Sequence, residues 1–109
     1  MNEIKKLQAA ILHFRDERDW AKFHNPKDLA INLSVEAAEL LELFLWKNSD
    51  EANPENVKRE LADVLYSSLL LASTYGFDVE RIVLEKLKEN AKRYPVEKAH
   101  GRKEKYDEL

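Results

Sequence analysis

The residues that break helices are rare in this sequence, and they stand where helical patterns of apolar residues begin or end. Pro26 and Pro54 each follow an asparagine, and an Asn-Pro pair is typical of a helix start because Asn caps the first turn and Pro fits its backbone. Gly76 and Pro95 follow such patterns and indicate helix ends. With only 2 Gly and 3 Pro in 109 residues, and no strand-like alternation of useful length, the chain is predicted to be all-α.

The segments between these signals have the lengths and short connections of an antiparallel four-helix bundle. Helices are predicted over residues 2–20, 26–46, 54–75 and 79–94. We expect residues 1–95 to form this four-helix domain and residues 96–109 to form a charged C-terminal tail.

The third predicted helix is apolar on more than one face. Leu61 and Leu65 belong to its main apolar stripe, while Leu69, Leu70 and Leu71 carry the apolar character around the back. A helix that is apolar on most sides requires burial on most sides, and a domain of this size builds only a thin core. The pattern therefore favours a homo-oligomer, and the alternative is a central helix within a monomer.

Composition excludes several classes of site and partner. The absence of Cys excludes disulfides, thiolate metal sites and cysteine nucleophiles, and it fits an expected cytoplasmic location. The net charge of −3 gives no reason to expect a nucleic-acid polymer as partner. The longest apolar-rich stretch, residues 64–72, is too short to span a bilayer, so we expect no membrane association through a spanning helix.

Four acidic residues lie where a helix would be expected to be buried. Glu36 falls in the middle of the apolar stripe of the second helix, and Glu39 lies at its border one turn along. Glu60 and Asp63 repeat the same spacing on the third helix and share a face with Ser67. If two faces of that helix are buried, these acids are predicted to lie inside as well.

Such a group of carboxylates needs something to offset its charge. At ~5 Å and an effective dielectric constant of ~20, each pair costs about 3 kcal/mol, and burial adds a desolvation cost. The acids are therefore protonated, paired with cations such as Lys58, Arg59 or Lys86, or bound to metal. An all-oxygen ligand set suits Mg²⁺ or Mn²⁺ rather than zinc or copper. The residues alone leave the metal site and the salt-bridged cluster equally open.

The fourth helix carries a polar stripe on its apolar face. Lys86, Asn90 and Tyr94 follow one another at four-residue spacing, and Arg93 lies at the edge of the stripe. Inward polar groups need partners. They either face an anion such as phosphate, with metal between them and the carboxylates, or Lys86 pairs with an inward acid while Tyr94 packs with its hydroxyl at the rim.

Aromatic and histidine side chains cluster near the predicted helix junctions. Trp20 and His24 precede the second helix, and Trp46 stands at its end. Their planes could stack on a base, although junction aromatics more often cover the end of a bundle.

Taken in order along the chain, these motifs resemble those of the MazG-like all-α nucleoside triphosphate pyrophosphohydrolases, and within them the small dCTP pyrophosphatase branch. The resemblance covers nearly the whole chain. The motifs that carry it are Phe14–Trp20, Glu36-x-x-Glu39, Glu60-x-x-Asp63 and Lys86-x-x-x-Asn90-x-x-x-Tyr94-Pro95.

The resemblance implies roles for the residues singled out above. Glu36, Glu39, Glu60 and Asp63 would bind Mg²⁺; Lys86, Asn90 and Tyr94, with Arg93, would contact the triphosphate; Trp20, His24 and Trp46 would form the base and sugar pocket, with help from a neighbouring subunit. The implied reaction cleaves the α–β phosphoanhydride to a nucleoside monophosphate and pyrophosphate, which cleanses or balances nucleotide pools. Members of this family are dimers or tetramers.

Metal-assisted hydrolysis also needs a proton acceptor. A carboxylate that is not fully used as a ligand can take the proton of the attacking water. Glu39 is predicted for this role because it lies at the border of the apolar stripe. Two other functions remain open from the sequence: a non-catalytic helical interaction module, and a sensor that binds a nucleotide without hydrolysing it.

Overall fold

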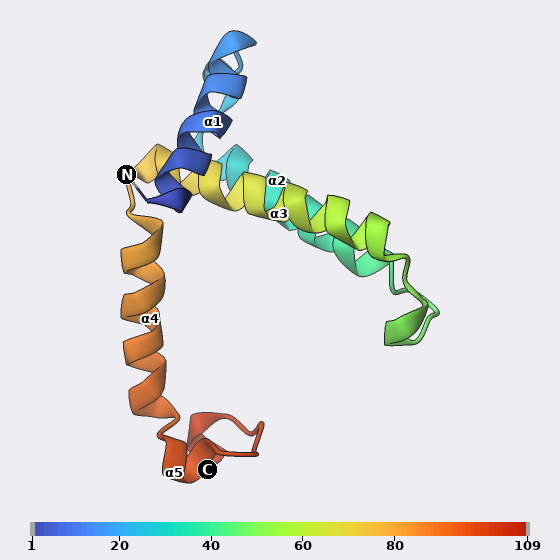
Figure 1. Cartoon of the computed structure of the whole chain (residues 1–109), viewed down its shortest axis with the longest axis vertical. Helices are drawn as coiled ribbons and strands as arrows, with labels where there is room; N and C mark the ends of the chain where they lie inside the picture. The colour runs from blue at the N-terminus through green and yellow to red at the C-terminus, as the bar shows by residue number, and fades with distance from the viewer. Residues whose placement is uncertain (1, 109) are drawn as a thin grey trace. The chain divides into compact units, whose positions relative to one another are not determined.

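The computed structural model of the chain describes residues 2–108 and is helical throughout (Figure 1). The helices are α1 (Glu3–Glu17), α2 (Pro26–Glu42), α3 (Pro54–Tyr75), α4 (Val79–Arg93) and α5 (Val96–Ala99), with 3₁₀ turns η1 (Ala21–Phe23), η2 (Ser49–Glu51) and η3 (Tyr106–Glu108). No strand occurs in residues 2–108, which confirms the all-α prediction. In the same range, no helix has the length and hydropathy needed to cross a bilayer.

The chain forms two compact units. The first ends at Phe77 and contains α1, α2 and α3, and the second begins at Asp78 and contains α4 and α5. The packing of four helices into one bundle, the domain boundary at residue 95 and the homo-oligomer therefore stay predictions.

Side-chain caps begin the helices where the sequence predicts. The Oδ1 atom of Asn25 accepts a hydrogen bond from the backbone N–H of Asp28 at 2.9 Å, ahead of Pro26. Asn53 caps α3 in the same manner before Pro54. These caps satisfy N–H groups that have no partner within the helix, and they confirm both predicted Asn-Pro starts.

The predicted ends of the first two helices are wrong by three and four residues. α1 ends at Glu17 rather than near Trp20, because Asp19 adopts a left-handed backbone (φ 54°) and the N–H of Trp20 bonds back to the carbonyl of Arg15. α2 ends at Glu42 rather than near residue 46, because the next residues bond three positions back instead of four. Trp46 is itself left-handed, with φ 61°. Neither end carries the glycine that usually signals such a stop.

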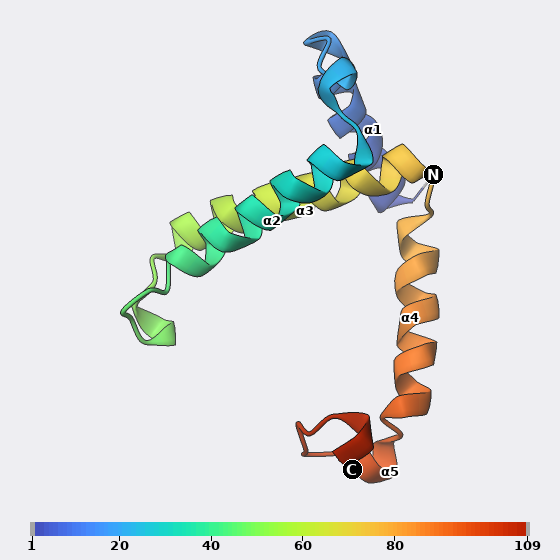
Figure 2. The same cartoon turned by 180° about the vertical axis from the view of Figure 1, so that it is seen from behind.

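The core of the first unit lies between an antiparallel helix pair and the helix that crosses it. α2 and α3 run side by side in opposite directions (Figures 1 and 2), and Leu29 of α2 and Leu70 of α3 are almost fully buried. α1 packs on the C-terminal half of α3, where the amide of Gln8 donates to the Leu69 carbonyl at 3.2 Å and to the Ser73 hydroxyl at 3.0 Å. This arrangement sets the faces of α2 and α3 that meet each other.

Burial along α3 is uneven. Leu69 and Leu70 are buried, whereas Leu61 and Leu65 keep 46% and 52% of their surface exposed. The C-terminal half of α3 therefore fulfils the expectation of burial on more than one face, and its N-terminal half does not within the described residues.

Gly76 ends α3 in a left-handed conformation, and its replacement gives a stability prediction. Its φ is 69°, and a Cβ built there meets no atom within 4 Å. Gly76→Ala is therefore expected to lower the free energy of unfolding by about 1 kcal/mol through backbone strain alone. Urea denaturation followed by circular dichroism measures the difference. Gly76→Asn is the control and should lose less, since Asn tolerates this backbone region; equal stability of all three proteins would contradict the assignment.

Candidate functional site

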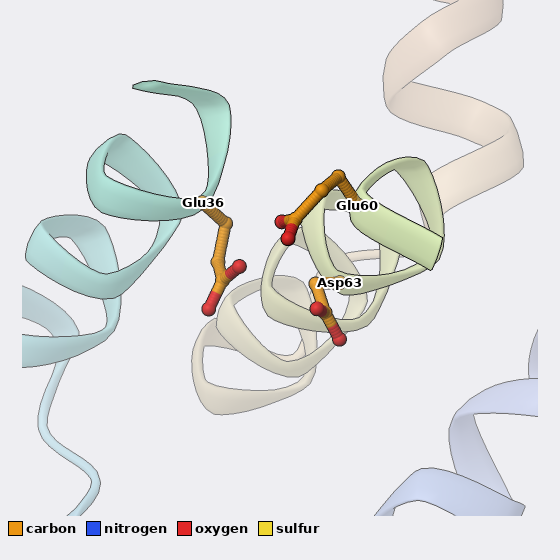
Figure 3. Close-up of side chains that lie close together, drawn as sticks. All are labelled: Glu36, Glu60 and Asp63. Carbon is orange, nitrogen blue, oxygen red and sulfur yellow. The ribbon is translucent and has the colours of Figure 1, made fainter. Parts of the chain in front are cut away.

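Three carboxylates from two helices converge in the first unit. Glu36 extends from α2 towards Glu60 and Asp63 of α3 (Figure 3). Each contributes one oxygen to a group whose members all lie within 4.8 Å of one another. The helix geometry explains the meeting: Glu60 and Asp63 are one turn apart on the same face of α3, and α2 passes that face in the opposite direction.

The carboxylates lack partners at their most buried atoms. The Oε2 atoms of Glu36 and Glu60 are inaccessible to solvent, and neither has a hydrogen-bond partner. Buried polar atoms in folded proteins nearly always have a partner. Two adjacent unpartnered oxygens are therefore a donor set that fits a divalent cation, for which oxygen ligands are the ordinary choice.

The electrostatics of the cluster show the same lack of countercharge. Burial, followed by the neighbouring charge of Glu39 and smaller effects of Asp63 and Glu60, raises the pKa of Glu36 to about 7. Burial and the charges of Glu39 and Asp63 also raise the pKa of Glu60. Glu39 is not one of the three closest carboxylates, but it acts on both of them and so lies beside the group.

The salt-bridged alternative finds no support in the described residues. No lysine or arginine within residues 2–108 forms an ion pair with the four predicted acids; Lys58 pairs with Glu55 at 3.8 Å instead, and Lys86 pairs with Glu89 at 3.4 Å. Of the explanations for inward acids, protonation and a bound cation remain. A pKa of about 7 leaves Glu36 partly protonated at neutral pH when no cation is bound.

An apolar cavity lies directly beside Asp63. Its volume is about 460 Å³, within the range of small-molecule sites. Its lining residues are Ala10, Ile11, Phe14, Trp20, Asp63 and Tyr66. Trp20 was predicted as a site residue, whereas Phe14 and Tyr66 were missed. Tyr66 stands three residues after Asp63, and that spacing is the signal that could have revealed it.

The aromatic rings of this cavity form a continuous wall. The Phe14 ring meets the Trp20 ring edge-on at 5.8 Å between centroids and the Tyr66 ring at 6.4 Å. This wall joins α1, the turn that follows it and α3. A flat aromatic ligand thus has an apolar surface to pack on within reach of a carboxylate.

His24 and Trp46 do not line this cavity. Burial, with a smaller contribution from the charge of Arg15, lowers the pKa of His24, and its Nδ1 atom is buried without a hydrogen-bond partner. Trp46 is 100% exposed. The structure therefore leaves both proposed base contacts as predictions and places only Trp20 at the cavity.

The predicted triphosphate contacts all belong to the second unit. Lys86, Asn90 and Arg93 lie on α4, and Tyr94 is its C-cap. Arg93 pairs with Glu89 at 3.3 Å, the same acid that Lys86 contacts. These cations share one exposed partner, and such a surface pairing is weak enough to exchange for another anion.

Comparisons with known proteins identify the family to which this chain belongs. A model of the MazG-like family matches residues 31–109. The chain belongs to this family. Two proteins named dCTP pyrophosphatase 1, from Rattus norvegicus and Homo sapiens, are each 37% identical over 117 residues, and the match covers 100% of this chain and 67% of theirs. These matches confirm the predicted family and the enzyme class, a nucleotide pyrophosphohydrolase.

A solved structure extends the MazG-like likeness to the fold. The crystal structure of a pyrophosphatase from Archaeoglobus fulgidus matches with a TM-score of 0.81 and 36% identity. The match covers 87% of this chain and 94% of that one. The helical framework that brings Glu36 to Glu60 is thus shared with a pyrophosphatase.

Proposed function

We propose that this MazG-like protein hydrolyses a nucleoside triphosphate, with dCTP as its preferred substrate, to the monophosphate and pyrophosphate with the aid of Mg²⁺. The observation that carries the proposal is the convergence of Glu36, Glu60 and Asp63 with two buried, unpartnered oxygens and no cationic neighbour. The curated relatives that match the whole chain are dCTP pyrophosphatases, which supports the choice of substrate.

The four acids have two roles in this proposal, metal binding and proton acceptance. Glu36, Glu60 and Asp63, with Glu39 beside them, are the residues that would hold Mg²⁺, and Mn²⁺ fits the same oxygen ligands. When bound, such an ion supplies positive charge to phosphate oxygens and makes water a better nucleophile. Glu39 accepts the proton of the attacking water on a carboxylate oxygen, since it lies at the edge of the cluster rather than among its three closest members.

The cavity and the family resemblance give candidate contacts for the nucleotide. Trp20 offers the base a stacking surface in the cavity beside Asp63. We assign the base and sugar also to His24 and Trp46, with help from a neighbouring subunit of a homodimer or homotetramer. We assign the triphosphate to Lys86, Asn90, Arg93 and Tyr94.

A panel assay tests the reaction class and the base preference together. Each common dNTP and NTP is incubated with the protein and Mg²⁺, and phosphate is measured with and without added inorganic pyrophosphatase. We expect phosphate only when pyrophosphatase is present and fastest release from dCTP. The nucleoside monophosphate, separated by chromatography without the coupling enzyme, should not form in EDTA. Phosphate without the added enzyme would instead show cleavage at the γ position.

Two other outcomes would replace the proposal. Nucleotide binding without release of pyrophosphate would identify a sensor. Neither binding nor a Mg²⁺-dependent thermal shift would leave a non-catalytic interaction module.

A further inference from the structure

The guanidinium group of Arg18 lies over the aromatic wall of the cavity. Its Cζ atom is 3.8 Å from the centroid of the Phe14 ring and 5.9 Å from that of Trp20. Its Nη1 atom also donates a hydrogen bond to the Phe14 carbonyl at 2.9 Å. One side chain thus contacts two of the rings that line the cavity beside Asp63, and both contacts are attractive for a cation over a ring face.

Within residues 2–108, Arg18 forms one ion pair, and that pair is weak. The acid nearest to it is Glu17, at 4.0 Å, and both side chains are more than two-fifths exposed. An exposed ion pair at that distance contributes little. Arg18 is not itself a lining residue of the cavity, so any effect it has on a ligand acts through Phe14 and Trp20.

The backbone leaves Trp20 dependent on such a contact. α1 has already ended at Glu17, and Trp20 follows the left-handed residue Asp19. Backbone hydrogen bonds from the N–H groups of Arg18 and Trp20 to the Arg15 carbonyl, at 3.2 and 3.1 Å, and from the N–H of Asp19 to the Asp16 carbonyl, at 3.1 Å, tie this turn back to the helix. These bonds fix the backbone but leave the Trp20 side chain to be oriented by its ring contacts.

We propose that Arg18 is a positioning residue that holds Phe14 and Trp20 as a wall for the nucleobase and so sets the affinity for the base. The inference rests on the proposed function in naming a nucleobase as the occupant. Arg18 contacts neither the reacting phosphate nor the acidic cluster in this assignment. Its loss should therefore weaken binding and leave the chemical step intact.

Steady-state kinetics with dCTP and Mg²⁺ test the first half of the proposal. Arg18→Gln, which removes the charge of the side chain and shortens it but keeps a polar amide, is expected to raise KM about fivefold with kcat within about twofold. Arg18→Lys retains a cation over the rings and is expected to recover part of the loss in KM. A fall in kcat at unchanged KM, or no change in either constant, would overturn the assignment.

Fluorescence tests the wall itself without any turnover. The chain has 2 Trp, so Trp46→Phe leaves Trp20 as the sole reporter. In that background Arg18→Gln is expected to make Trp20 more accessible to acrylamide. If Arg18→Gln leaves the acrylamide quenching of Trp20 unaltered, the proposal is wrong even if the enzyme is active.

Lys22→Gln is the matched control for both measurements. Lys22 stands in the same turn and pairs with Asp19 at 3.1 Å, but its ring contact is with Phe23, outside the cavity. We expect it to leave KM and Trp20 quenching unchanged; an effect equal to that of Arg18→Gln would show that the turn, not the cation, matters. Absence of pyrophosphate release from every nucleotide would refute the proposed function, while the acrylamide result would still decide on Arg18.

Discussion

Glu39→Gln is expected to lower kcat for dCTP hydrolysis by about a thousandfold, which is the usual scale for loss of a general base. The amide keeps the size of the side chain and still offers an oxygen, but it cannot accept the proton of water. Because Glu39 is not among the three closest carboxylates, Mg²⁺ should still raise the melting temperature of this variant. Pyrophosphate release and differential scanning fluorimetry measure the two effects.

A second variant separates the proton acceptor from the metal ligands. Glu60→Gln is expected to lose both turnover and the Mg²⁺-dependent thermal shift, since it removes a charge from the closest group of carboxylates. Glu42→Gln, an exposed acid one turn beyond Glu39 on α2, is the matched control and should resemble the unaltered protein. Substantial activity in Glu39→Gln would remove Glu39 from the mechanism.

The stability of the metal-free protein is expected to fall as the pH rises from about 5 to about 7. Glu36 has a folded-state pKa of about 7, against 4.5 for an ordinary glutamate. Between these values the folded protein holds a proton that the unfolded chain releases, so rising pH favours unfolding. The expected loss is of the order of 2 kcal/mol after allowance for solvent screening. The raised pKa of Glu60 acts in the same direction.

Denaturation in EDTA across this pH range measures the loss. His24 opposes it, because a lowered histidine pKa gives stability that is present at high pH and lost as the pH falls. The difference between the unaltered protein and Glu36→Gln isolates the carboxylate, and this variant is expected to be the more stable of the two above pH 7. An identical pH profile for both proteins would contradict the raised pKa of Glu36.

Mg²⁺ is expected to reverse this trend. An ion and a proton compete for the same carboxylate, so the affinity for Mg²⁺ should rise with pH through the pKa of Glu36. Titration calorimetry at pH 6 and at pH 8 compares the two affinities. A pH-independent affinity would show that Glu36 is not a ligand.

How much of the fold can be predicted from this sequence depends on whether a helix end has a residue-level signal. Pro26 and Pro54 mark starts that the structure confirms, because a cap is a local hydrogen bond between near neighbours. The stops after Glu17 and Glu42 have no such signal, since the left-handed positions that follow them are taken by Asp19 and Trp46 rather than by glycine. Asp adopts that region less readily than glycine, so its presence in the sequence does not by itself mark a helix end.

The candidate site divides in the same way. Glu36 is identified by helical periodicity, because an acid in the middle of an apolar stripe is directed towards the interior with the apolar residues around it. The cavity could not be predicted, because it depends on the crossing of α1 over α3, which brings Phe14 to Tyr66. Periodicity defines the face of each helix but not the angle at which two faces meet.

The left-handed residue at the exit of α1 constrains how this chain can change over evolution. A deletion or insertion between Glu17 and Trp20 would displace the indole from the cavity, since the non-helical turn through the left-handed Asp19 sets the position of Trp20 after the end of α1. The connection between α2 and α3 carries none of the residues that line the cavity beside Asp63 and should accept changes of length more readily. Homologous chains are therefore expected to vary in length between α2 and α3 and to keep a fixed number of residues after α1.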